Sequence, residues 1–179
     1  MKEKEMMRLF AALEPTPDFR NALAALQSRL REAGVTGRYL DSANLHLTLA
    51  FIGMWPEDIT ALLPAVDRPF PIALSHPGVF PEAKVLWAGV QPSEALDGLA
   101  EKVRRALSQA NIPFDRKDFK AHITLARKPF VPERVDLSAI EVPPAVMTVR
   151  QVCLYRSDHL ENGMAYTVIG RGSAGISES

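Results

Sequence analysis

Two short stretches with the same pattern decide the fold: Asn44-Leu45-His46-Leu47-Thr48-Leu49 and Lys120-Ala121-His122-Ile123-Thr124-Leu125. Each contains a histidine, an apolar residue, a threonine and a leucine, in that order. Side chains of a β-strand alternate between its two faces, so each histidine shares a face with its threonine, and the apolar residues occupy the other. One face therefore fills a core, and we expect the face with the histidine and threonine to be free for binding or chemistry.

The repetition of this pattern indicates a function. A single histidine followed two positions later by a threonine is unremarkable on the exposed side of a half-buried strand. A solvated strand, however, has no need to repeat a titratable side chain and a hydroxyl in the same order in both halves of a chain. We therefore expect His46 with Thr48, and His122 with Thr124, to be two half-sites contributed by two similar halves of one domain.

The hydrophobic pattern around these strands predicts an α+β fold with mostly antiparallel sheets. Thr16-Pro17-Asp18 has the residues of a helix start, and Gly34 those of a helix end. Apolar residues at helical spacing predict three helices, over 17–33, 55–66 and 93–107. Alternating residues predict further strands over 6–13, 70–80 (broken at 75–78), 84–90, 145–155 and 164–169. We expect one domain over residues 1–172 and a disordered tail over 173–179.

Composition limits the classes of protein and of partner. The chain has 179 residues, with 21 basic and 21 acidic side chains, which argues against binding long nucleic acids but leaves room for a local basic cluster that grips one chain end. Cys153 is the only cysteine, so no internal disulfide and no cysteine-based zinc site can form. No apolar run approaches the length of a membrane span, and the first five residues do not resemble a signal peptide. We expect a cytoplasmic monomer.

Two histidines that face one another suit a displacement in which one proton is removed and another delivered. Imidazole titrates near pH 6.5, so one ring can be neutral while the other is protonated. In-line hydrolysis of a phosphodiester has this requirement, and the threonine hydroxyls can donate to the non-bridging phosphate oxygens. A zinc site is the alternative chemistry, but neither motif carries an Asp, Glu or Cys on the face of its histidine. We therefore expect no metal and no cofactor.

The motifs and their surroundings resemble the 2H phosphoesterases, and more closely the RNA 2′,3′-cyclic phosphodiesterases, also called 2′-5′ RNA ligases. The His-x-Thr pairs carry the resemblance to the superfamily. Four segments in the same order carry the resemblance to the branch: Arg8 to Ala12, Asn44 to Gly53, Phe119 to Arg127, and Leu154 to Ser157. The resemblance runs from about residue 7 to residue 170.

This resemblance implies a bilobal domain, with two sheets around a water-filled central cleft and helices packed outside. It implies hydrolysis of the 2′,3′-cyclic phosphate at an RNA 3′ end to a 2′-phosphate, with reversible 2′-5′ ligation as a further activity. His46 would then protonate the leaving 3′ oxygen, and His122 would be the base that activates water. Thr48, Thr124 and Arg127 would bind the substrate, which is an RNA 3′ end or a small cyclic-phosphate nucleotide.

Two positions complicate the match. Ala121 stands where the family usually has proline, and strict alternation from His122 would turn Arg127 toward the core unless the strand bulges near Ala126. The aromatic residues Phe10, Tyr39 and Phe51 could either stack on bases or fill the core.

Two alternative functions remain open. One is a binding module for RNA ends or nucleotides that has no catalytic activity. The other is a phosphodiesterase of the same class that acts on 2′-5′ oligonucleotides or on cyclic nucleotide-sugar phosphates.

Overall fold

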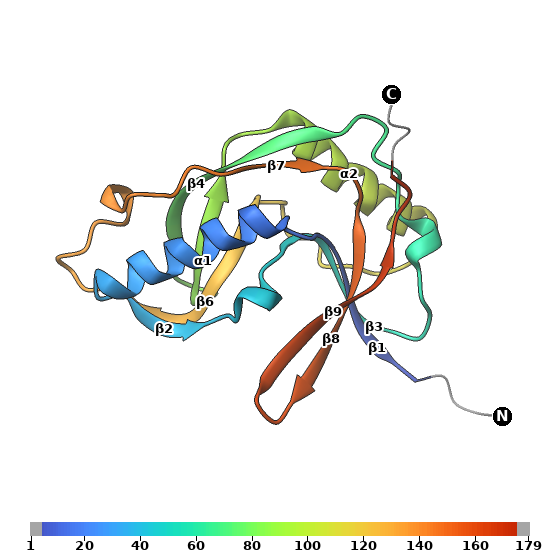
Figure 1. The fold of residues 1–179 in the computed structure, drawn as a ribbon. Coiled ribbons are helices and arrows are strands. Elements are labelled where there is room, and N and C mark those ends of the chain that lie inside the picture. Colours follow the sequence, from blue (N-terminus) through green and yellow to red (C-terminus); the bar gives the residue numbers. More distant parts are fainter. Residues whose placement is uncertain (1–4, 175–179) are drawn as a thin grey trace.

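A computed structural model describes residues 5–174 of the chain, which form two α-helices and nine strands (Figure 1). The helices are α1 (Pro17–Glu32) and α2 (Glu94–Gln109), and single 3-10 turns lie at η1 (Ser42–Asn44), η2 (Thr60–Leu62) and η3 (Leu137–Ala139). The strands are β1 (Met7–Leu13), β2 (Thr36–Tyr39), β3 (Leu47–Trp55), β4 (Phe70–Phe80), β5 (Val85–Val90), β6 (His122–Phe130), β7 (Val146–Val149), β8 (Cys153–Leu160) and β9 (Gly163–Arg171). The prediction of an α+β class is confirmed.

The strands follow one continuous path, β7-β4-β5-β6-β3-β1-β8-β9, and β2 pairs with β6 beside this path. Each pair of named strands is antiparallel. The halves meet at the pair β3–β6, whose only Cα partners are Leu47 and Ile123. Instead of the two separate sheets that were expected, the fold therefore has two halves joined at this pair, directly after the two histidines.

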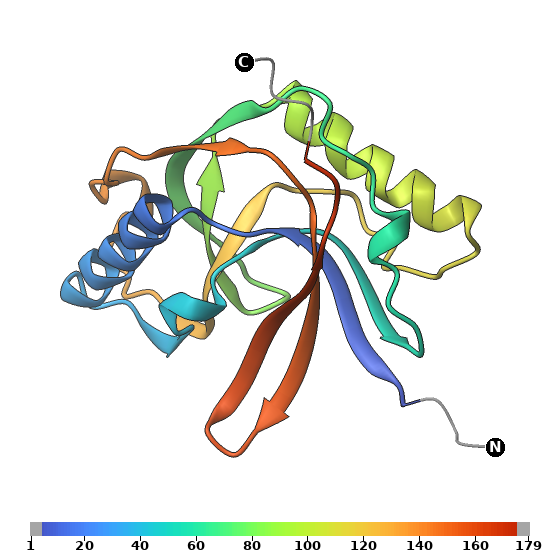
Figure 2. The ribbon, with the colours of Figure 1, turned by 45° about the vertical axis from the view of Figure 1, so that its right-hand side comes forward.

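Both helices begin where the sequence provides a cap. The Thr16 hydroxyl accepts a hydrogen bond from the Phe19 amide and Pro17 follows it, while the Ser93 hydroxyl accepts from the Leu96 amide. Figures 1 and 2 show the two helices on different sides of the strands, and the β8–β9 hairpin projecting from the body. The apolar face of each helix is buried in one large core with the inner faces of the strands.

A smaller apolar cluster lies on the opposite face of β1 and β8. Its fully buried members are Phe10, Ala12, Cys153 and Tyr155, which alternate along their strands with residues of the main core such as Leu9 and Leu154. Burial raises the pKa of the Cys153 thiol, so this cysteine remains protonated, as a structural side chain does. The sheet thus carries an apolar cluster on each face at this end.

The predicted helix over 55–66 is wrong, because only the 3-10 turn η2 forms there. Proline shortens this segment: Leu63 precedes Pro64 and has the extended conformation (φ −69°, ψ 132°) that a following proline imposes. The break that was predicted within 70–80 is a register shift between Leu74 and Pro77, and β4 continues through it.

The C-terminal segment remains against the body somewhat further than the sequence indicates. The Gly172 amide donates to the Val152 carbonyl at 2.7 Å, and Ala174 forms an isolated bridge with Val66. The first two residues of the predicted tail, 173 and 174, are therefore placed next to the body. Residues 175–179 of that prediction lie outside the described residues.

Candidate active site

The two His/Thr motifs meet at the centre of the sheet. Leu47 and Ile123 are 2% and 1% exposed and point into the main core, as predicted. Because side chains alternate along a strand, the residues on either side of this pair project from the opposite face. We call the four half-buried residues that do so, His46, Thr48, His122 and Thr124, the His/Thr quartet.

Both imidazoles are held in the same way. The Nδ1–H of His46 donates to the Asn44 carbonyl at 2.7 Å, and the Nδ1–H of His122 donates to the Lys120 carbonyl at 2.6 Å. A carbonyl oxygen can only accept, so in each neutral ring the proton resides on Nδ1. The Nε2 atoms, which then carry a lone pair, are the ones left for a substrate.

The ring of His46 lies among aromatic side chains. Its centroid is 4.6 Å from that of Phe10, 5.5 Å from that of Tyr155 and 5.0 Å from that of Tyr166. Burial among these rings is the main reason that the pKa of His46 falls from 6.5 to about 4, and the hydrogen bond to Asn44 opposes the change. Smaller contributions from the charges of Arg127, His122 and Arg20 lower this pKa further, which indicates that these side chains are near His46.

The ring of His122 also packs against aromatic side chains, but it is less buried than the ring of His46. Phe80 meets it edge-on, with 5.1 Å between centroids, and Trp87 lies 5.2 Å beyond Phe80. Burial lowers the pKa of His122, although its hydrogen bond to the Lys120 carbonyl acts in the other direction. Both histidines are consequently neutral at pH 7 before a substrate binds.

The two motif strands bulge at the same place. In the β1–β3 register Ala12 pairs with Thr48 and Ala11 with Ala50, so Leu49 is skipped. In the β5–β6 register Trp87 pairs with Thr124 and Leu86 with Ala126, so Leu125 is skipped. Each half therefore has the same irregularity one residue after its threonine.

The bulge in β6 determines where Arg127 points. Ala126 remains buried in the core, and Arg127, the next residue, is exposed and near enough to influence His46. The sequence predicted that Arg127 would turn away from the core only if the strand bulged near Ala126, and the structure has that bulge.

A side chain from a helix holds each bulge. The Gln27 amide, from α1, is buried and donates to the Leu125 and Leu40 carbonyls, both at 3.0 Å. The Arg104 guanidinium, from α2, donates through Nε to the Leu49 carbonyl at 3.2 Å. Both residues stand on helices that the sequence predicts, yet nothing in a helical pattern indicates that their polar atoms reach the carbonyls of a bulged strand.

Asn44 connects the first histidine to the β8–β9 hairpin. Its Nδ2 donates to the Met164 carbonyl at 2.9 Å, its Oδ1 accepts from the Tyr166 amide at 3.3 Å, and its own carbonyl holds His46. The hairpin lies 120 residues further along the chain, so its contact with the first motif is invisible in the sequence. Tyr166, which the sequence did not single out, is brought against His46 by the same contact.

The three aromatic residues left open by the sequence occupy different places. Phe10 is 3% exposed and packs against His46. The Tyr39 hydroxyl donates to the Val35 carbonyl at 2.8 Å, and its ring packs on the main core. Phe51 is half-buried, with the Arg8 guanidinium 5.0 Å from its ring centroid.

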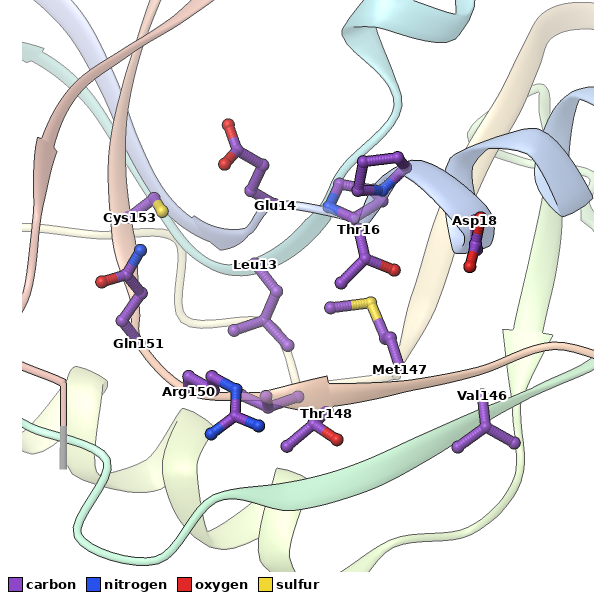
Figure 3. A pocket seen from close by; sticks show the side chains of 13 residues that line it. Leu13, Glu14, Thr16, Asp18, Val146, Met147, Thr148, Arg150, Gln151 and Cys153 are labelled. Carbon is purple, nitrogen blue, oxygen red and sulfur yellow. The ribbon is translucent and has the colours of Figure 1, made fainter. Parts of the chain in front are cut away.

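A separate groove of about 530 Å³ lies between the start of α1, β7 and the start of β8 (Figure 3). Glu14, Asp18, Arg150 and Cys153 are among the side chains around it, and none of the His/Thr quartet lines it. It is therefore not the site that the motifs predict. Among residues 5–174, no group of three or more His, Cys, Asp or Glu is placed to hold a metal ion.

Two matched half-sites, each with one imidazole and one hydroxyl, on a duplicated antiparallel sheet define the class of this site. The family model described as the 2′-5′ RNA ligase superfamily matches residues 15–161. The match covers most of the sequence, so the chain belongs to the 2′-5′ RNA ligase superfamily, in agreement with the resemblance of its motifs.

Individual relatives agree with this assignment. The RNA 2′,3′-cyclic phosphodiesterase of Thermus thermophilus is 33% identical over 184 residues, covering 93% of this chain and 90% of the relative. That of Escherichia coli is 28% identical, with 93% and 96% covered. The chain spans only 52% of a relative of the same name from Geobacillus stearothermophilus, with 29% identity. The crystal structure of E. coli LigT complexed with 3′-AMP is similar, with a TM-score of 0.77, 28% identity, and 97% of this chain and all of the other covered.

Proposed function

We propose that this chain hydrolyses 2′,3′-cyclic phosphates at RNA 3′ ends to 2′-phosphomonoesters by acid/base catalysis with His46 and His122. The observation that carries the proposal is the matched fixing of the two imidazoles, whose Nδ1–H groups donate to backbone carbonyls at 2.7 and 2.6 Å. Both Nε2 atoms are thereby available to exchange protons. The names of the relatives, each an RNA 2′,3′-cyclic phosphodiesterase, support the substrate.

The two histidines take opposite roles in one displacement. His122, the more open ring, removes a proton from the attacking water as the water oxygen bonds to phosphorus. The bond from phosphorus to the 3′ oxygen breaks, and His46 gives a proton to that oxygen. Because His46 is neutral in the free protein, it must gain this proton when the substrate binds, and the negative charge of the phosphate favours that gain.

The remaining residues of the site stabilise the phosphate. The hydroxyls of Thr48 and Thr124 donate to its non-bridging oxygens, where negative charge increases in the transition state. Arg127, which the bulge in β6 turns outward, adds a positive charge on the same side of the sheet. Ring strain in the cyclic phosphate lowers the barrier, so we propose that the reaction needs no metal.

We further propose that the protein works as a cytoplasmic monomer. In the described part of the chain, neither helix has the length and apolar character to cross a bilayer.

The test is to incubate the purified protein with a short RNA that ends in a 2′,3′-cyclic phosphate, with and without a chelator. We expect a 2′-phosphate product at the same rate in both samples. Saturable binding without any product would instead indicate a binding module. Turnover of 2′-5′ oligonucleotides or cyclic nucleotide-sugar phosphates in preference to the RNA would assign a different substrate to the same site. Incubation of the RNA that ends in a 2′,3′-cyclic phosphate with a second RNA that has a free 5′-hydroxyl tests 2′-5′ ligation.

A further inference from the structure

Two arginines face one another on neighbouring strands beside the His/Thr quartet. In the antiparallel pair β2–β6, Arg38 is the Cα partner of Arg127, and Tyr39 is the partner of Ala126. Tyr39 and Ala126 both pack on the main core. Because directly paired residues share a face and neighbours along a strand alternate, Arg38 and Arg127 project together from the other face of the sheet. Figure 1 shows β2 alongside β6 in this position.

This arrangement is unfavourable for the protein alone. Like charges that are directly opposite in a sheet destabilise it. Both side chains are exposed, and within residues 5–174 neither takes part in an ion pair with an acidic side chain. Asp41, the next acidic residue along the chain, uses its carboxylate to accept from the Ala43 amide. An anion placed between the two guanidinium groups would remove the repulsion.

The position of the pair identifies that anion. Arg127 is near His46 and, under the proposed function, contacts the phosphate that reacts. Arg38 lies on the strand next to Arg127, and neighbouring strands are about 4.8 Å apart. A cyclic phosphate is the 3′ terminus of its RNA, so every other phosphate of the substrate lies on the 5′ side. The guanidinium of arginine is the side chain best suited to grip a phosphate with two hydrogen bonds.

We propose that Arg38 binds the phosphodiester that precedes the terminal nucleotide, so that the site prefers an RNA end to a free cyclic mononucleotide. This inference rests on the proposed function, whose substrate it narrows to an oligonucleotide. It also gives a role to a charge at a position where the fold alone would favour a neutral residue.

The test compares kcat/KM for two substrates with the same terminal base: a five-nucleotide RNA that ends in a 2′,3′-cyclic phosphate, and the 2′,3′-cyclic mononucleotide. In Arg38→Gln, the ratio of the RNA value to the mononucleotide value is expected to fall about tenfold, mainly through KM for the RNA. Arg38→Lys keeps the charge and should recover part of the ratio. Each phosphate contact with a single strand contributes about 0.7 to the steepness of log affinity plotted against log salt concentration. Arg38→Gln, which loses one such contact, should therefore reduce the slope for the RNA by about that amount.

Arg68→Gln is the matched control. Arg68 is also exposed, and it lies just before the first residue of β4. The other end of this strand, Phe80, packs against His122, and eleven strand residues span roughly 35 Å, so Arg68 is far from the site. This variant is expected to keep the ratio and the salt slope of the natural chain. Thermal unfolding should show that Arg38→Gln is as stable as the natural chain or slightly more stable, since it removes a repulsion.

With an active natural chain, two outcomes would overturn the inference. One is an unchanged ratio in Arg38→Gln, and the other is an equal loss on both substrates, which would place Arg38 in catalysis or folding instead. If the natural chain turns over neither substrate, the proposed function fails. Binding of a five-nucleotide RNA with a 3′-terminal phosphate, followed by fluorescence anisotropy, then decides: weaker binding by Arg38→Gln supports the phosphate contact, and equal binding overturns it.

Discussion

Leu47 and Ile123 are Cα partners, and they form the only residue pair between the strands β3 and β6 that carry the two motifs. Each follows its histidine directly and precedes its threonine, so one pair of buried apolar residues places all four polar residues of the quartet on one face. Since the strands are antiparallel, the order of histidine and threonine is reversed between them, and each histidine lies across from the threonine of the other motif. The site thus has an approximate twofold arrangement.

Replacing either threonine by valine tests the proposed role of the hydroxyls. Valine has nearly the same shape, so Thr48→Val and Thr124→Val should remain folded and lose only a hydrogen-bond donor. We expect kcat on an RNA cyclic phosphate to fall by about ten- to a hundredfold in each variant, because a donor to the transition-state oxygens is lost. The exposed Thr167→Val is the control. Unchanged kcat in both site variants would remove the threonines from the mechanism.

Stability should depend on pH through the histidines. The pKa of His46 is about 4 in the folded chain and near 6.5 when unfolded, so between these values the unfolded chain binds a proton that the folded chain does not. The free energy of unfolding therefore has its full value above pH 6.5 and decreases as the pH is lowered toward 4. His122, whose pKa is also lowered, acts in the same direction.

Urea unfolding between pH 7.5 and 4.5 measures this effect. We expect the loss of stability in His46→Asn to be smaller than in the natural chain by about 2 kcal/mol, a value that allows for water at the half-buried ring. His76→Asn, which removes an exposed histidine of β4, is the control and should retain the natural dependence. The same pH dependence in His46→Asn as in the natural chain would contradict the burial of His46 as the cause.

Gln27→Leu tests whether the bulge in β6 depends on α1. The change removes the donor to the Leu40 and Leu125 carbonyls in a buried place, so the free energy of unfolding should fall by about 1–3 kcal/mol. We also expect KM for the RNA to rise, because the bulge that turns Arg127 outward loses a support. Gln109→Leu, at the exposed end of α2, is the control. A stable variant with natural kinetics would show that the bulge forms without Gln27.

Asn44→Ala separates positioning from chemistry. The side chain bonds to the β8–β9 hairpin, and the adjoining carbonyl fixes the His46 ring. We expect kcat to fall about tenfold and the pH profile of kcat to shift, since the His46 ring gains freedom and water. Asn44→Asp retains only the acceptor for the Tyr166 amide and should be intermediate. Asn162→Ala, in the exposed hairpin turn, is the control. If Asn44→Ala lost stability but kept the pH profile of the natural chain, Asn44 would have a purely structural role.

The sequence predicted the parts of the fold that follow from local periodicity. The motif strands, the cap of α1 and the condition on Arg127 could all be predicted, because each depends on residues close together in the chain. The helix predicted over 55–66 was wrong, because the apolar spacing was given more weight than Pro64, which holds Leu63 in an extended conformation.

The residues that support the site could not be predicted from the sequence. Gln27 and Asn44 bond to carbonyls or amides about 100 residues away, and no local pattern carries that information. The facing of Arg38 and Arg127 likewise depends on a strand, β2, that is only four residues long and has no alternating pattern.

The central claim is that His46 and His122 act on the same phosphate, and a double-mutant comparison tests it most directly. The measurement is kcat/KM for a short RNA ending in a 2′,3′-cyclic phosphate, with the natural chain, His46→Ala, His122→Ala and the variant with both changes. We expect each single change to cost at least about a hundredfold, and the double change to cost little more than the larger single one, because the two rings serve one displacement. Full activity in either single variant, with its folding verified by thermal unfolding, would contradict the account.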